Sequence, residues 1–198
     1  MSYRLVMSYR LVISAMLVLA TSSIVYAKAP GAHQHGVAKL AVAVDGNTLE
    51  VTLESPLDNL LGFERAPRTE AERKAVRQMA QRFHAAAGLF APSAAAQCTA
   101  LPAELTSEVL DPALLAPAGT PAPAVPAGAA TPRKSADGHA DMDATVRFNC
   151  SNPAALKGVD TAGLFKAFPK FRQIDAALVT GIQQRGSRLT ARQTMLAW

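Results

Sequence analysis

The sequence predicts an α+β domain in which a mostly antiparallel sheet has helices packed on one face. Some segments alternate apolar and polar residues with the period of two that strands require, while others repeat apolar residues at helical spacing. The order of these segments is ββα…βαββ, which favours an antiparallel sheet with helices on one side. The 198 residues, 49% of them hydrophobic and 18% charged, suffice for one sizeable core.

The first 27 residues have the pattern of a secretory signal peptide. Arg4 and Arg10 precede an apolar run over residues 11–25, and Val25-Tyr26-Ala27 provides a cleavage site. The run is shorter than the ~20 apolar residues that cross a bilayer, so a membrane anchor is the less favoured interpretation. We expect export, cleavage near Ala27, and one domain over residues 28–198 that retains no membrane span.

A β-hairpin is predicted over residues 37–54. Apolar residues alternate with smaller or polar ones along both halves, at Leu40, Val42 and Val44 and at Leu49, Val51 and Leu53. Between the halves, Asp45-Gly46-Asn47 tolerates the positive φ angles of a tight turn. The alternation implies one buried and one solvent-facing side.

A loop over residues 55–68 leads from the hairpin to a predicted helix. Thr69-Glu70-Ala71-Glu72 has the sequence of a capping box, and Gly88 can end the helix. Apolar residues follow the box at helical spacing, at Val76, Met79, Ala80 and Phe83. His84 lies at the apolar margin of this helix, and we interpret it as a packing or surface residue.

Two cysteines, Cys98 and Cys150, are the only ones in the chain. In an exported protein such a pair most simply forms a disulfide, and a pair of thiolate zinc ligands is the less favoured alternative. Residues 112–132, between the cysteines, carry no charge and are mostly alanine and proline. We therefore expect a flexible insertion over residues 112–138.

Strand alternation resumes over residues 141–150. A short helix around residues 161–168 is predicted to end at Pro169, and Ile174, Ala176 and Leu178 mark another strand. Glycines at 181 and 186 permit a turn, and a final strand is expected near residues 187–191.

Histidines and aspartates at the start of two predicted strands are candidate metal ligands. His33 and His35 precede the hairpin, and His139 and Asp141 precede the strand over residues 141–150. Residues i and i+2 of an extended chain point to the same side. Imidazole and carboxylate together suit zinc, although such short patterns also occur by chance.

The sequence favours no catalytic or nucleic-acid function. It contains no nucleophile elbow, no zinc-protease helix motif and no phosphate-binding loop, so we expect a protein that is not an enzyme. Arg4 and Arg10 are the only charged residues before Lys28, which reduces the net charge of +5 to +3 after cleavage. A charge of +3 with no basic stripe is no nucleic-acid footprint.

Several of these segments resemble the ZrgA family of zinc uptake proteins. The matching runs are His33–Leu40, Asp45–Glu50, Glu54–Glu64, Ala66–Thr69, His139–Asp141, Phe165–Pro169 and Leu196–Trp198. The resemblance implies a periplasmic protein that binds zinc, assists a zinc import system and catalyses no reaction. Carried over by position, it implies His33, His35, His139 and Asp141 as zinc ligands.

The chain departs from the family pattern in two places. Family members commonly carry a tract rich in histidine and aspartate between the cysteines, where this chain has its Ala/Pro stretch. They also often carry histidine after Phe-Glu, where this chain has Arg65. We therefore expect fewer bound ions. A metal-free protein-interaction module remains the alternative, and a metal-dependent hydrolase has no motif in its favour.

Overall fold

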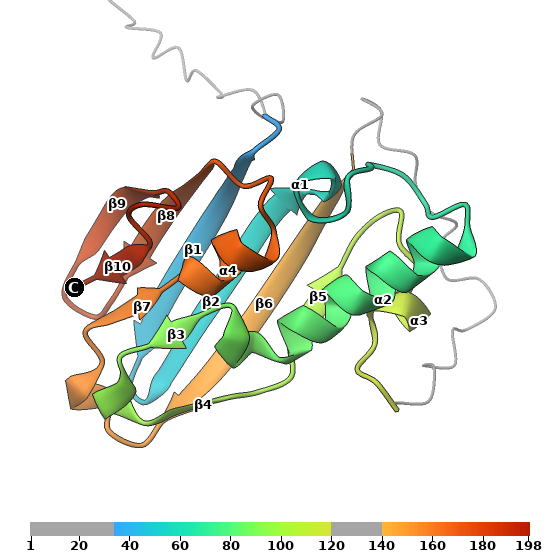
Figure 1. The fold of residues 1–198 in the computed structure, drawn as a ribbon. Coiled ribbons are helices and arrows are strands. Elements are labelled where there is room, and N and C mark those ends of the chain that lie inside the picture. The colour runs from blue at the N-terminus through green and yellow to red at the C-terminus, as the bar shows by residue number, and fades with distance from the viewer. Residues whose placement is uncertain (1–33, 120–139) are drawn as a thin grey trace, which may run out of the picture. The chain divides into compact units, whose positions relative to one another are not determined.

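A computed structural model describes residues 34–119 and 140–198 of the chain (Figure 1). The helices are α1 (Leu57–Leu61), α2 (Glu70–His84), α3 (Pro112–Leu115) and α4 (Ala162–Ala167). The strands are β1 (Val37–Asp45), β2 (Thr48–Pro56), β3 (Ala91–Pro92), β4 (Cys98–Ala100), β5 (Glu104–Thr106), β6 (Asp141–Cys150), β7 (Gly158–Asp160), β8 (Gln173–Val179), β9 (Gln184–Leu189) and β10 (Met195–Ala197). The predicted signal peptide and the 120–138 part of the predicted insertion lie outside the described residues.

The described strands form two sheets. The larger sheet has seven strands in the order β4-β6-β2-β1-β8-β9, and β5 also pairs with β6. The smaller sheet has the order β10-β7-β3. The pairs are antiparallel except β1 with β8, which is parallel. This confirms a sheet-rich and mostly antiparallel fold with few helices.

The predicted hairpin is confirmed as β1 and β2. Its last strand pair before the turn joins Asp45 to Thr48, and Gly46 has the positive φ of 55° that the turn requires. Alternate residues of both strands are buried, among them Leu40, Val42, Leu49, Val51 and Leu53. The intervening residues are partly or fully exposed, so the two faces of the hairpin differ as the alternation predicts.

Aromatic side chains from α2 and from the segment after α4 meet in the core. The Phe83 ring stacks on Phe168 at 5.5 Å between centroids, and Phe168 meets the Phe171 ring edge-on at 6.1 Å. Figure 1 shows α2, α4 and the smaller sheet in front of the larger sheet. Their buried side chains belong to the same hydrophobic cluster as those of β1, β2 and β6.

The capping box of the predicted helix is confirmed. Thr69 accepts a hydrogen bond from the Glu72 backbone N–H, and the Glu72 carboxylate accepts one from the Thr69 N–H. The helix ends at His84, four residues before the predicted stop at Gly88. A short 3₁₀ turn over Ala86–Gly88 follows, because the chain turns inward there to bury Ala86, Leu89 and Phe90.

Two short helices lie where the sequence predicts loops. Helix α1 occupies part of the predicted 55–68 loop, and its Leu57 and Asn59 are buried. Helix α3 occupies the start of the predicted insertion, so the expectation of a flexible chain is wrong over residues 112–115. Asp111 caps α3 by accepting from the Ala113 N–H, and burial of Leu115 attaches the helix to the core.

The C-terminal region also differs from the prediction. Strand β9 covers residues 184–189 and not 187–191, and β10 extends the smaller sheet beyond it. Short strands such as β3, β7 and β10 hold two or three residues each, which is too few for a periodic pattern to be recognised.

The predicted disulfide between Cys98 and Cys150 is present. The two residues are direct partners in the β4–β6 pair, and they are separated by 52 residues in the sequence. Because both sulfurs are bonded to each other, the alternative of two thiolate zinc ligands is wrong. In the part of the chain that the structure describes, no helix has the length and hydropathy needed to cross a membrane.

Candidate metal site

Three strands bring the predicted ligand segments to one end of the larger sheet. β1 starts at Val37, β2 ends at Pro56, and β6 starts at Asp141. Pro56 is paired with Asp141, and continuing the Lys39–Glu54 register by two residues places Val37 opposite Pro56. Strands lie ~4.8 Å apart, so the first residues of β1 and β6 are only ~10 Å apart across β2.

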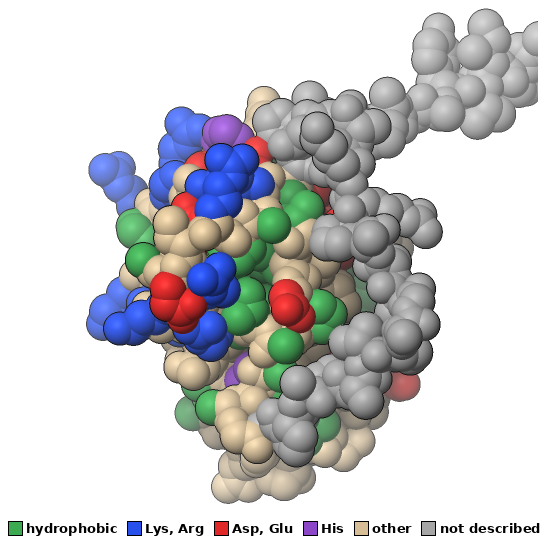
Figure 2. All heavy atoms as spheres, turned by 90° about the vertical axis from the view of Figure 1, so that its right-hand side faces the viewer, with side chains coloured by type: hydrophobic (Ala, Val, Ile, Leu, Met, Phe, Trp, Pro, Cys, Tyr) green, Lys and Arg blue, Asp and Glu red, His purple; other side chains and the backbone are tan. Residues whose placement is uncertain are grey.

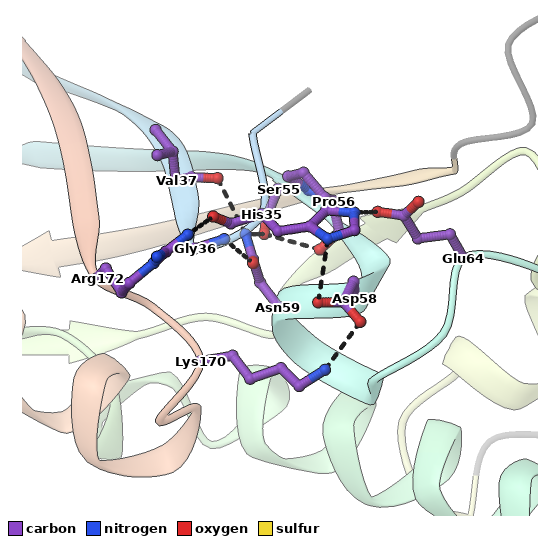
Figure 3. Close-up of polar contacts among 10 residues, drawn as sticks. All are labelled: His35, Gly36, Val37, Ser55, Pro56, Asp58, Asn59, Glu64, Lys170 and Arg172. Carbon is purple, nitrogen blue, oxygen red and sulfur yellow. Dashed lines mark hydrogen bonds and ion pairs between the residues drawn. The ribbon is translucent and has the colours of Figure 1, made fainter. Parts of the chain in front are cut away.

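The backbone at His35 is held by a buried asparagine of α1. The Asn59 side chain accepts from the Gly36 N–H at 2.6 Å and donates to the Val37 carbonyl at 2.9 Å. It also donates to the hydroxyl of Ser55 at 3.2 Å, and both Asn59 and Ser55 are buried. Asn59 therefore fixes the chain that carries His35 against the end of β2 (Figure 3).

A glycine and an arginine complete this attachment. Gly36 has a φ of 85°, and a Cβ atom there would clash with the Nε atom of Arg172. The space that glycine leaves open lets the Arg172 guanidinium donate to the His35 carbonyl. A side chain at position 36 would both strain the backbone and displace Arg172.

The His35 ring lies between two carboxylates (Figure 3). Its Nε2 atom is 3.2 Å from Oε1 of Glu64, and its Nδ1 atom is 3.9 Å from Oδ2 of Asp58. Asp58 is also paired with Lys170, whose Nζ lies 2.8 Å from Oδ1. The ring is about half exposed, whereas the Glu64 side chain is only 11% exposed. The imidazole is therefore open to solvent on part of its surface, whereas the Glu64 oxygen that faces its Nε2 atom is buried.

The predicted ligands are placed as follows. His35 and Asp141 both lie at this end of the sheet. His35 is two residues before the start of β1, and Asp141 is the first residue of β6. The Asp141 carbonyl accepts from the Ser107 hydroxyl at 2.7 Å, which fixes the start of β6. His33 and His139 lie outside the described residues, so their part in a site stays a prediction.

His84 is separate from this arrangement. Its Nε2 atom lies 2.7 Å from the Leu115 carbonyl, which connects the end of α2 to α3. The ring is partly buried, in agreement with its interpretation as a packing residue. His84 therefore offers a histidine control outside the site.

Charged groups next to the site are mostly engaged with one another. Arg65 forms a two-point ion pair with Glu72 and lies over the Phe63 ring. The Arg65 side chain and the Arg68 N–H lower the pKa of Glu72 to about 2. Arg65 therefore faces the start of α2. Figure 2 shows basic side chains gathered around one of the two described histidines.

A second pair of carboxylates lies on the solvent-facing side of the same sheet end. Asp143 is paired across the strands with Glu54, which in turn forms an ion pair with Lys39. Burial raises the pKa of Asp143, and the Glu54 carboxylate raises it further. Both effects disfavour the ionised form of Asp143, which is the form that binds a metal ion.

Sequence reasoning missed Glu64, Asp58 and Asn59. Glu64 and Asp58 contact His35 across 29 and 23 positions of the chain, which no local spacing reveals. Asn59 did carry a signal, because a polar residue within the apolar group Leu57–Leu61 needs buried hydrogen-bond partners. Within residues 34–119 and 140–198, no group of three or more His, Cys, Asp or Glu is placed to hold a metal ion.

One comparison with known proteins gives a match. The family model described as "ZrgA family zinc uptake protein" matches residues 32–198. The chain belongs to the ZrgA family. This ZrgA protein has no match among curated proteins. The matched range covers the whole described domain and includes all four predicted ligands, and the family's name relates the chain to zinc uptake and not to a chemical reaction.

Proposed function

We propose that this ZrgA protein is a non-catalytic periplasmic protein that binds zinc and assists a zinc import system. The observation that carries the proposal is the placement of His35 and Asp141 at one end of the sheet, on segments separated by about a hundred residues in the sequence. Membership of a zinc uptake family supports zinc as the ion. The signal-peptide pattern of residues 1–27 supports export.

The proposed site combines His35 and Asp141 with His33 and His139. His33 precedes His35 by two residues, and His139 precedes Asp141 by two, so both are tethered to the same sheet end. Three imidazoles and a carboxylate match the four-coordinate preference of zinc. The chain has few further histidines, so we expect one ion at this site and not a high-capacity store.

Zinc titration of the purified chain by calorimetry tests the proposal. We expect one zinc ion per chain, and we expect His33→Ala, His35→Ala and His139→Ala each to weaken binding at least about 10-fold because each removes one metal–nitrogen bond. His84→Ala is the matched control and should bind as the wild type does. Unchanged affinity in all three site variants would refute the shared site and would favour the metal-free interaction module.

A further inference from the structure

The two ring nitrogens of His35 face carboxylates with different surroundings. Glu64 approaches Nε2 at 3.2 Å, and Asp58 approaches Nδ1 at 3.9 Å from the other side of the ring (Figure 3). The two nitrogens of an imidazole point in diverging directions. The carboxylates therefore cannot both bind one ion together with His35, and this explains why the three residues do not form a three-ligand group.

Asp58 has the features of an outer partner. Its second oxygen is held by Lys170 at 2.8 Å, and the residue lies in the first turn of α1 beside Asn59. In many zinc sites, a carboxylate accepts the N–H of the ring nitrogen that does not bind the metal, and thereby orients the ring. Asp58 lies on the Nδ1 side of the ring, with Lys170 fixing its carboxylate, but the 3.9 Å separation is too long for a hydrogen bond. The His35 ring would have to move about 1 Å toward Asp58 for this contact to form.

Glu64 has the geometry of a ligand. Zinc bonds of 2.0–2.2 Å to nitrogen and oxygen, arranged tetrahedrally, put the two donor atoms ~3.4 Å apart. The distance of 3.2 Å between His35 Nε2 and Glu64 Oε1 is close to this value. A zinc ion can therefore bridge the two atoms with only a small shift of either side chain.

We propose that Glu64 is a direct metal ligand together with His35 Nε2, and that Asp58, held by Lys170, is a positioning residue at Nδ1. This inference rests on the proposed zinc function. His35 and Glu64 would supply two of the four donors that zinc takes, so at most two of the other three predicted ligands would bind the same ion directly. Because both cysteines are in the disulfide, the donors are nitrogen and oxygen only. Such a set suits zinc and similar divalent ions.

Zinc titration of the whole chain with three carboxylate variants tests these roles. We expect Glu64→Gln to weaken zinc binding about 100-fold, because it removes a charged direct ligand. Asp58→Asn should weaken it about 10-fold, since outer partners of metal ligands contribute 10–100-fold to affinity. Glu54→Gln is the matched control, because Glu54 is paired with Lys39 on the solvent-facing side. It should change affinity less than 2-fold. Thermal melting of each variant checks that it is folded.

A nitrogen NMR spectrum of the histidine rings shows which ring nitrogen of His35 binds zinc and which carries the proton. These signals would not change if Glu64 and Asp58 only stabilised the fold. In the zinc-loaded wild type, we expect His35 to be metal-bound at Nε2 and to carry its proton at Nδ1. A metal bound at Nδ1, or wild-type affinity in Glu64→Gln, would overturn the assignment while leaving the zinc function intact. A wild type that binds no zinc would instead refute the proposed function.

Discussion

Replacing both cysteines with alanine is expected to lower the free energy of unfolding by about 4 kcal/mol. The disulfide closes a loop of about 50 residues and thereby lowers the conformational entropy of the unfolded chain. The bond joins Cys98 to Cys150 across 52 residues. Alanine is the suitable replacement, since Cys150 is buried and serine would place a hydroxyl in the core. Urea denaturation of the wild type and the double variant measures the difference.

Two controls separate the role of the bond from other effects of the substitution. A reductant should destabilise the wild type and leave the double variant unchanged. Zinc affinity should be retained in the folded variant, because the disulfide lies at the last residue of β6 and the site lies at its first. A stability loss below 1 kcal/mol, or a loss of zinc binding in the folded variant, would contradict this assignment.

Asn59→Ala is expected to cost about 2–4 kcal/mol of stability, because it removes the partners of buried polar groups. The side chain satisfies the Gly36 N–H and the Val37 carbonyl, and it also donates to Ser55. Substitution removes the buried partner of the Gly36 N–H and the partner of the Val37 carbonyl, while the Ser55 hydroxyl keeps its hydrogen bond to the Pro56 carbonyl. Urea denaturation again gives the measurement.

The same substitution should weaken zinc binding, because Asn59 holds the chain that carries His35. Asn149→Ala is a matched control: Asn149 is exposed on β6 at the end opposite Asp141, and a surface change of this kind alters stability by less than about 0.5 kcal/mol. Equal effects of the two substitutions would show that the attachment of His35 to α1 does not depend on Asn59.

The long elements of the fold could be predicted from the sequence because each carries a local pattern. Alternation defines β1, β2 and β6, and the capping box at Thr69 defines the start of α2. The parallel pairing of β1 with β8 could not be predicted, because it joins segments that no turn connects. Helix α3 was hidden by its alanine and proline content, although Asp111-Pro112 is a good helix start.

The candidate site could be predicted only in part. His35 and Asp141 were recognised because each lies at the start of a strand pattern, and strand pairing then brings these starts together. Glu64 and Asp58 could not be assigned to His35, because their contacts depend on how α1 and the following loop fold back over the sheet end. Lys170 reaches Asp58 from a segment 112 positions away, which only the tertiary structure reveals.

The most direct test of a zinc site at this end of the sheet is to locate the ion in crystals of the zinc-loaded protein by anomalous diffraction at the zinc edge. We predict one strong peak 2.0–2.2 Å from His35 Nε2 on the side that faces Glu64. Two results would contradict a zinc site at His35. One is a peak elsewhere, at His84 or beside Glu54 and Asp143 on the solvent-facing side of the sheet, and the other is no peak in crystals that contain zinc.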